Sequence, residues 1–502
     1  MAECEDDYYD SYYSERLDHD DANKKKNKFI TLTEEDVGSR MDDDILQVSS
    51  LLLVSREAAT ILLCRYNWDV TDVVQEWFEN QEVVRSASGL FREKPGPMDV
   101  EDGDEEFVCR ICWKEHPIAL VVVASAACGH VFCKNCWKEF ISKSINEGYV
   151  KDGGCLMLRC PQDSCGAAVG GNIIRSLASD GDKNKYDKFL ARSYVESRAN
   201  LKLCPTPGCN CAVELDNRGP DRLSKNFDVS CNCMYGFCWN CLGEAHSPVD
   251  CETVALWAVK NSSDLETENW LLANTKPCPK CQRRIENVGD IDNGDWYMTF
   301  APPCGCDLRN GEETLACNTY EKAKNEGVYD EVEKTRRRAK ASWDYFERWY
   351  NNHLSLERAF LDLHLMKNQN LEMLGKIHDL EATQCWFIVD AWVQIVECTR
   401  VLKWASVYGY YLQQYEHKKK ELFDYLLSEA EGVYEILHQC ANKGLSKCLE
   451  AESECSLDTF LDFRTKLPAL TRVTRKYFAD LVTALENGIA DVASSSHTIK
   501  QK

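Results

Sequence analysis

The chain has 502 residues, of which 44% are hydrophobic, so it is long enough for several domains with separate cores. Its formal net charge is −23, because 82 acidic residues outnumber 59 basic ones. A surface this acidic repels the phosphates of nucleic acid, and the charge therefore disfavours a DNA-binding protein.

The N-terminus carries neither feature of a secretory signal, since Met1 is followed by an acidic, tyrosine-rich segment where a signal needs basic residues and then an apolar run. The most apolar long run, residues 387–412, includes four charged residues, so no bilayer span is predicted. These are Asp390, Glu397, Arg400 and Lys403. We expect an intracellular protein, cytoplasmic and/or nuclear, with no membrane partner. In a reducing compartment, clustered cysteines are more often metal ligands than disulfides.

Residues 1–43 form an acidic segment with a small basic island at residues 24–28. It holds too few apolar side chains to order itself, and we predict a disordered tail.

Residues 44–92 predict a small helical module, because apolar residues recur at helical spacing in two runs separated by residues 67–69. The apolar positions are Ala59, Leu62, Leu63, Val70, Val73, Val74, Trp77 and Phe78. Two interpretations remain open: a small core of no special function, or a docking module that resembles the ubiquitin-associated type. A linker follows at residues 93–106, where Pro95 and Pro97 break any helix and an acidic run begins.

Cysteines dominate the next part of the chain, with 21 of the 28 lying between Cys109 and Cys317. The first zinc module, residues 107–170, offers eight nitrogen and sulfur donors at short spacings, enough for two closed tetrahedral zinc sites. Closed sites are structural, because no coordination position is left for water or substrate. The donors are Cys109, Cys112, Cys128, His130, Cys133, Cys136, Cys160 and Cys165. Cys155 is left over and is not predicted to bind zinc.

The second zinc module, residues 185–255, again offers eight donors and therefore two more sites. They are Cys204, Cys209, Cys231, Cys233, Cys238, Cys241, His246 and Cys251. Cys211 is a spare that could compete with Cys209.

Beyond Cys317 the cysteines thin out and long helical periodicities begin, which predicts a helical bundle over residues 321–495. Its apolar stripes are most simply core. They comprise Ala339, Trp343, Phe346, Tyr350 and Leu354; Leu422, Leu426, Val433 and Leu437; and Phe478, Leu481, Val482 and Leu485, ended by Gly488.

This order of modules resembles that of the RING-between-RING ubiquitin ligases, which have an eight-ligand RING finger, an in-between-RING module, a third cysteine group and a helical domain. The segments Glu397–Tyr411 (ECTRVLKWASVYGYY) and Ala484–Val492 (ALENGIADV) resemble the Ariadne subfamily. The likeness covers the chain from about residue 44 to its end. It implies a multidomain, mainly α fold with small zinc-stabilised α+β modules.

The resemblance also implies a cross-braced first module, in which Cys109, Cys112, Cys133 and Cys136 hold one zinc and the other four donors hold the second. A ubiquitin-conjugating enzyme docks on this module in the family, and Ile111 and Pro161 match the apolar positions that bind it. Simple packing is the alternative interpretation of Ile111.

The third module, residues 276–320, departs from the family. There a cysteine in a Gly-Cys-x-His-Met run accepts ubiquitin as a thioester, helped by the histidine. The matching run here is Gly294-Asp295-Trp296-Tyr297-Met298, so Asp295 replaces the nucleophile and Tyr297 the histidine. One zinc site can close with Cys278, Cys281, Cys304 and, as a candidate fourth ligand, Cys306. The second site keeps only Cys317 and is not expected to hold zinc.

The leading hypothesis is therefore a catalytically degenerate Ariadne-type ligase that binds a conjugating enzyme, ubiquitin or a ubiquitin-like protein, or a cullin-RING ligase complex. The alternative is an active ubiquitin ligase that works through the first RING alone or through Cys304 or Cys306. Zinc-dependent nucleic-acid binding is a third class, which the negative charge disfavours.

Overall fold

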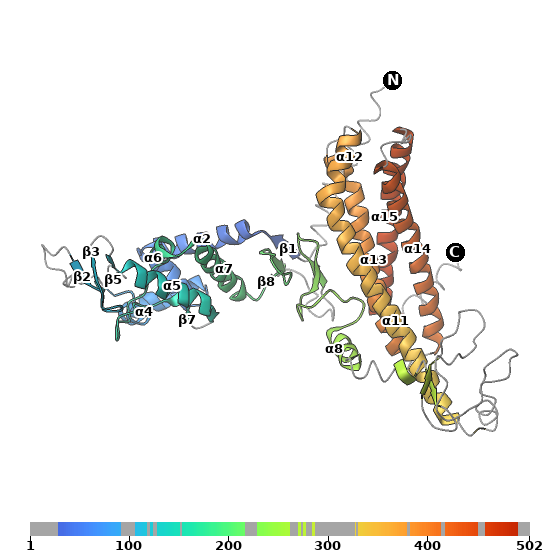
Figure 1. Ribbon diagram of the computed structural model, residues 1–502, viewed down its shortest axis with the longest axis horizontal. Helices are drawn as coiled ribbons and strands as arrows, with labels where there is room; N and C mark the ends of the chain where they lie inside the picture. The colour runs from blue at the N-terminus through green and yellow to red at the C-terminus, as the bar shows by residue number, and fades with distance from the viewer. Residues whose placement is uncertain are drawn as a thin grey trace. The chain divides into compact units, whose positions relative to one another are not determined.

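A computed structural model gives the fold of the chain, which is mainly helical with small two- and three-stranded sheets (Figure 1). This confirms the predicted fold class. The structure describes residues 29–91, 106–117, 121–123, 128–150, 153–215, 228–261, 270–272, 275–277, 284–286, 327, 330–378, 382–412, 417–449 and 457–489. The chain divides into two compact units: Met1–Arg222 with Val229–Phe237, and Leu223–Asp228 with Cys238–Lys502.

Ordered structure begins earlier than the sequence predicts. Strand β1 (Phe29–Leu32) lies wholly inside the predicted acidic tail of residues 1–43, and helix α2 (Glu34–Leu52) begins inside it, so the predicted boundary is too late. A capping box starts α2: the Thr33 side chain accepts a hydrogen bond from the backbone of Asp36, whose carboxylate accepts one from the backbone of Thr33. Acidic residues in the first turn also favour a helix start, so here the negative charge stabilises a helix.

The helical module is completed by α3 (Arg56–Arg65) and α4 (Val70–Ser88), as the two apolar runs predict. Between them Asn67 and Trp68 adopt the left-handed conformation, with φ of 49° and 59°, which ends α3. Phe78 is an exception among the apolar positions, since it is 72% exposed.

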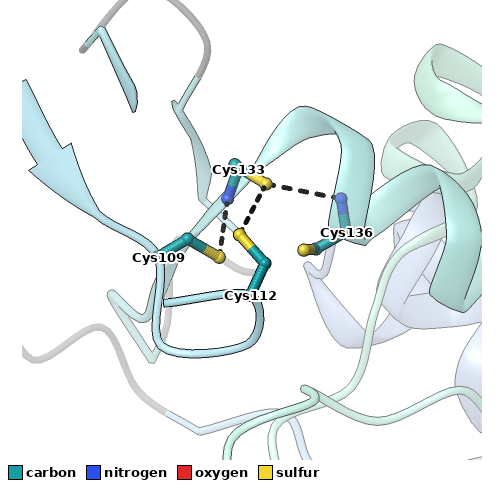
Figure 2. A group of neighbouring side chains, drawn as sticks. All are labelled: Cys109, Cys112, Cys133 and Cys136. Atoms are coloured by element: carbon teal, nitrogen blue, oxygen red, sulfur yellow. Dashed lines mark hydrogen bonds between the residues drawn. The ribbon is translucent and has the colours of Figure 1, made fainter. Parts of the chain in front are cut away.

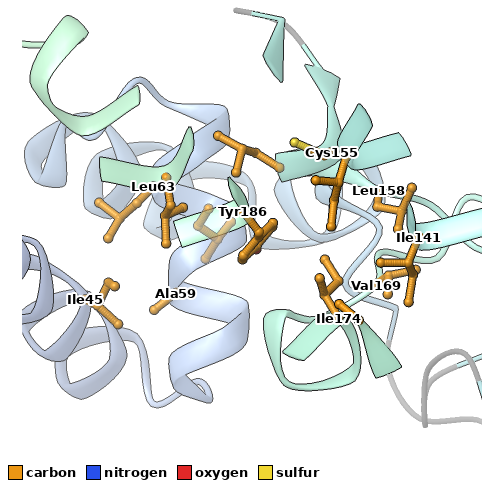
Figure 3. Packing of buried hydrophobic residues seen from close by; sticks show 14 of the residues in the cluster. Ile45, Ala59, Leu63, Ile141, Cys155, Leu158, Val169, Ile174 and Tyr186 are labelled. Atoms are coloured by element: carbon orange, nitrogen blue, oxygen red, sulfur yellow. The ribbon is translucent and has the colours of Figure 1, made fainter. Parts of the chain in front are cut away.

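The helical module shares one hydrophobic core with the first zinc module and the segment after it (Figure 3). Ala59 and Leu63 of α3 belong to the same cluster of buried residues as Ile141 and Tyr186. The indole N–H of Trp68 donates to the Ser193 hydroxyl at 3.0 Å. Helices α5 (Lys134–Glu147), α6 (Gly171–Leu177) and α7 (Asp180–Glu196) contribute buried residues to the same core. The helical module is therefore part of a larger folded unit.

A three-stranded sheet, in the order β1-β9-β8, joins the N-terminal strand to the second zinc module. It is formed by β1, β8 (Leu201–Leu203) and β9 (Ala212–Leu215), all antiparallel, with Phe29 opposite Leu215 and Leu32 opposite Ala212. An ion pair of 2.8 Å between Arg40 of α2 and Glu214 of β9 links that helix to the sheet. The remaining strands form two-stranded pairs: β2 (Glu106–Val108) with β3 (Glu115–Pro117), β4 (Val121–Val123) with β5 (Val131–Cys133), β6 (Tyr149–Val150) with β7 (Gly153–Gly154), β10 (Asp228–Ser230) with β11 (Gly236–Cys238), and β12 (Thr275–Pro277) with β13 (Arg284–Glu286).

The second unit contains a bundle of long helices around α13 (Trp386–Leu412), which packs against α11 (Asp330–Leu365), α14 (His417–Leu449) and α15 (Leu457–Glu486). Shorter helical pieces are α8 (Cys251–Lys260), η3 (Met366–Asn370), α12 (Leu371–His378) and η4 (Ala382–Cys385). Helix α13 is buried on every face, which explains why it is the most apolar long run of the sequence. No single described helix has the length and apolarity of a membrane span; by those criteria alone, one pair, α2 and α3, bent by 107°, qualifies.

The predicted stripes of the bundle are core in α15 and partly so in α11. Phe478, Leu481 and Leu485 are buried, and Gly488 ends the helix with φ of 71°. On α11, however, Tyr350 and Leu354 are 46% and 45% exposed. The buried face of that helix continues instead through Leu356, Ala359 and Leu363.

Two glycines of α14 are expected to respond to alanine in opposite directions. A Cβ at exposed Gly432 would meet no atom within 4 Å, so Gly432→Ala should raise the free energy of unfolding by about 0.5–1 kcal/mol, because alanine loses less chain entropy in a helix. A Cβ at Gly444 would lie 2.1 Å from the Phe463 ring, so Gly444→Ala should lower it by about 1–3 kcal/mol. Urea unfolding of both variants measures the difference, and equal effects would contradict the packing of α14 on α15.

Candidate metal centres

The first metal group consists of Cys109, Cys112, Cys133 and Cys136, whose sulfur atoms all lie within 4.8 Å of one another (Figure 2). Two cysteines lie on the turn between β2 and β3, and two lie at the start of α5. Cys133 is the N-cap of α5, and its sulfur accepts the backbone N–H of Cys136 at 3.5 Å. The hairpin and the helix therefore meet at four thiols.

The second metal group interleaves with the first along the chain and consists of Cys128, His130, Cys160 and Cys165. The Cys160 sulfur lies 3.7 Å from Nδ1 of His130. A tight turn sets the last pair: Cys160 donates its N–H to Ala167, and Ser164 adopts a left-handed φ of 63°. The structure thus brings together the two sets of four that a cross-braced RING implies.

The third metal group, in the second zinc module, consists of Cys204, Cys209, Cys231 and Cys233. The sulfur atoms of Cys204 and Cys233 are 3.7 Å apart, as are those of Cys209 and Cys231. Zinc–sulfur bonds of about 2.3 Å in a tetrahedron put neighbouring sulfurs about 3.8 Å apart. A disulfide would need about 2.05 Å, so the spacing is that of metal ligands.

The fourth metal group consists of Cys238, Cys241, His246 and Cys251. Nε2 of His246 lies 3.6 Å from the Cys241 sulfur and 3.4 Å from that of Cys251. The other ring nitrogen, Nδ1, lies 2.6 Å from the carbonyl oxygen of Val249 and donates to it. This hydrogen bond fixes the tautomer in which Nε2 has a lone pair for a metal.

Local hydrogen bonds lower the pKa of the Cys109, Cys233 and Cys238 thiols and so favour the thiolate, which is the form that binds metal. Burial raises the pKa of the Cys109 thiol, but backbone amides including those of Cys133 and Cys112 donate to its sulfur and lower the pKa to about 7. At Cys238, burial likewise raises the pKa, while the neighbouring His246 ring and the backbone amides of Cys241 and Asn240 lower it to about 6. Every other ligand thiol with a shifted pKa has it raised, with burial as the largest cause.

The donor sets, their spacing and their closed geometry fit Zn²⁺. Each group supplies four donors, so bound zinc would have a structural role, with no coordination position left for a reacting molecule. The two spare cysteines lie outside the four groups. Cys155 is buried in the shared core, where burial raises the pKa of its thiol to about 11, and Cys211 is a half-buried neighbour that does not displace Cys209.

The predicted docking residues lie beside the metal groups of the first module. Ile111 is 42% exposed, so simple packing does not account for it, and Pro161 is half-buried. Trp113 was not predicted; it is 76% exposed, with a left-handed φ of 57°, on the same turn as Ile111. The signal available in the sequence was a large apolar residue directly after the ligand Cys112, where the short knuckle leaves little room to bury it.

Two further groups near the metal sites were also not predicted from the sequence. One is His116, whose Nε2 lies 3.2 Å from the Cys112 sulfur. The other is a pair of buried cations on α13, which bind acidic residues beside the fourth metal group.

The predicted site residues of the third module lie outside the described residues. These are Cys278, Cys281, Asp295, Tyr297, Cys304 and Cys306. Their ligand and catalytic assignments therefore stay predictions.

Comparison with known proteins matches two segments of the chain to protein families. Residues 184–251 match the family described as "IBR domain, a half RING-finger domain", which covers the third and fourth metal groups. Residues 39–79 match "E3 ubiquitin-protein ligase ARIH1, UBA-like domain", which covers most of α2 to α4.

Three curated proteins of Arabidopsis thaliana resemble the chain over most of its length. The probable E3 ubiquitin-protein ligase ARI8 is 46% identical over 487 residues, which is 94% of this chain and 82% of ARI8. The probable ligase ARI7 is 45% identical, over 94% of this chain and 84% of ARI7. The probable ligase ARI10 is 40% identical, over 93% and 87%.

Proposed function

Because this chain belongs to the Ariadne-type RING-between-RING ubiquitin-protein ligases, we propose that it acts in protein ubiquitination by binding a ubiquitin-conjugating enzyme and ubiquitin without carrying ubiquitin itself. The family assignment supplies the pathway. The composition of the third module supplies the second part of the proposal.

The absence of sulfur at position 295 carries this proposal. A ligase that passes ubiquitin in two steps needs a thiolate to form the thioester, and Asp295 offers a carboxylate. An acyl anhydride with ubiquitin would be hydrolysed too readily to act as a carrier. No other cysteine lies between Cys281 and Cys304 in the sequence. Tyr297 also replaces the histidine that would act as general base.

The first two zinc modules support the binding half of the proposal. Their sixteen metal-binding residues are all present and gather into four closed groups. When bound, zinc would hold the loops of the first module in place. The exposed pair Ile111 and Trp113 then presents an apolar surface next to the first metal group. Tryptophan is one of the residue types enriched among the residues that contribute most binding energy in interfaces.

A discharge assay with the full chain tests the proposal. The chain is incubated with a conjugating enzyme charged with labelled ubiquitin, in the presence of free lysine, and run on a gel with and without thiol. We expect a complex with the charged enzyme, no thiol-sensitive ubiquitin adduct on the chain, and no acceleration of lysine discharge.

Variants of the same chain separate the outcomes. Ile111→Ala and Trp113→Ala should each weaken the complex at least about tenfold, whereas Val473→Ala, a 62% exposed residue of α15, should not. Discharge without an adduct would favour a ligase that works through the first RING alone. An adduct that disappears in Cys304→Ala or Cys306→Ala would refute the proposal and establish a displaced nucleophile.

Three finer assignments extend the proposal. A cullin-RING ligase complex is a further partner, supported by the N-terminal module that resembles ubiquitin-associated domains. DNA and membranes are not partners, in keeping with the net charge of −23. The location is cytoplasmic and/or nuclear.

A further inference from the structure

The fourth metal group is backed by charged residues of α13, all within the second unit of the chain. The carboxylate of Asp228 accepts the backbone N–H groups of His246, at 3.3 Å, and of Ser247, at 2.8 Å. The Arg400 guanidinium donates to the same carboxylate at 2.9 Å, on the oxygen that also accepts the Ser247 N–H. Arg400 also pairs with Glu397 on α13. A buried arginine of the bundle is thus linked through one carboxylate to the backbone of a metal ligand.

A second cation of α13 holds the loop between the ligands Cys241 and His246. Lys403 is 2% exposed, and its ammonium donates to both oxygens of Glu244, at 3.0 and 2.8 Å. Glu244 lies between Cys241 and His246 in the chain. The ammonium also lies 5.0 Å from the ring centre of Trp404.

Apolar contacts complete the interface. The Trp404 ring meets the His246 ring edge-on, with centres 6.1 Å apart. Val249, whose carbonyl fixes the His246 tautomer, belongs to one buried cluster with Trp257 of α8 and Val407 of α13. The metal loop therefore contacts α13 through the His246 ring, the Val249 side chain and the Glu244 carboxylate, while Asp228 of β10 links the loop backbone to Arg400.

We propose that α13 supplies the outer shell of the fourth zinc site, so that zinc binding there and docking of the helical bundle are coupled. A buried arginine or lysine is tolerated only while its carboxylate partners are in place, and losing a partner leaves an uncompensated charge. Asp228 and Glu244 are held in place by the loop that closes around the metal. Coupling between two binding events is reciprocal, so the bundle stabilises the zinc site by the same factor as zinc stabilises the docked bundle. This coupling requires bound zinc and does not depend on the proposed lack of a thioester.

One arm of the test measures zinc release from the full chain with a chromogenic chelator. In Arg400→Met and Lys403→Met, one zinc per chain should leave at least about tenfold faster than in the unmodified chain, while the others leave at the same rate. Arg475→Met is the matched control, because Arg475 pairs with Asp390 of α13 at 2.8 Å without facing the metal loop. Its zinc release should be unchanged.

The second experiment removes a zinc ligand and measures amide hydrogen exchange in α13. Cys241→Ser should lose one zinc and speed exchange in residues 400–407 at least about tenfold. Cys209→Ser, in the third metal group, should also lose one zinc but leave those amides unchanged. The proposal would be overturned if Arg400→Met and Lys403→Met released zinc at the rate of the unmodified chain. Unchanged hydrogen exchange in Cys241→Ser would also overturn it. If Arg400→Met does not fold, zinc release from Lys403→Met and the hydrogen-exchange experiment still test the proposal.

Discussion

A strong zinc chelator at neutral pH is expected to unfold both zinc modules and to leave the long helices α11, α14 and α15 intact. Each structural zinc site contributes about 10 kcal/mol of folding free energy, as much as the whole stability of an ordinary domain. The strands that the four metal groups join are only two to four residues long, too short to persist without them. At least four zinc ions per chain should be released.

Far-UV circular dichroism, with hydrogen exchange to locate the change, measures this result. Because α2 to α4 share a core with the first zinc module, we expect their amides to lose protection as well. Chelator already saturated with zinc is the control and should have no effect. Full protection of residues 106–170 after zinc release would show that the metal groups are not what holds that segment together.

Gly89→Ala is expected to lower the free energy of unfolding by about 3 kcal/mol or more, a large effect for one added methyl group. Gly89 caps α4 with φ of +72°, and a Cβ there would lie 2.3 Å from the carbonyl oxygen of Gly166 and 2.7 Å from the backbone nitrogen of Ala168. Gly89 also accepts the N–H of Ala168 at 3.0 Å. The clash is with backbone, which cannot swing aside.

Gly488→Ala is the matched control for this variant. Gly488 also follows a helix, with φ of +71°, but a Cβ there would meet no atom within 4 Å. It should cost only the left-handed conformation, about 1 kcal/mol. Denaturant unfolding followed by hydrogen exchange in α4 and α15 measures both. Similar losses of unfolding free energy in the two variants would mean that α4 does not pack against the first zinc module at Gly89.

The metal groups could be predicted from sequence because their information is local. Pairs such as Cys109 and Cys112, or Cys238 and Cys241, are separated by two residues, and the chemistry of zinc limits what such spacing can mean. The partition of the first eight donors came from resemblance, since spacing alone does not say which pairs share a metal. The structure places the pairs as the resemblance implies.

Long-range pairing could not be predicted, and it accounts for the errors. Nothing within residues 29–32 signals a partner strand at residues 212–215, so the sequence predicts a disordered tail where the structure has a strand. From the sequence alone, Arg400 and Lys403 indicate only that residues 387–412 do not span a bilayer. Their acceptors, Asp228 and Glu244, lie more than 150 residues away in sequence.

Because α2 to α4 and the first zinc module share one core, a fragment that lacks these helices is not a faithful substitute for the full chain. A fragment that starts at residue 106 would leave Tyr186, Ile141 and their neighbours without the side chains that cover them. Such a fragment would expose a large hydrophobic surface and bind many proteins non-specifically. Interaction screens made with an isolated RING fragment would then report adhesiveness instead of recognition, and only hits that survive with the intact N-terminal helices attached would be informative.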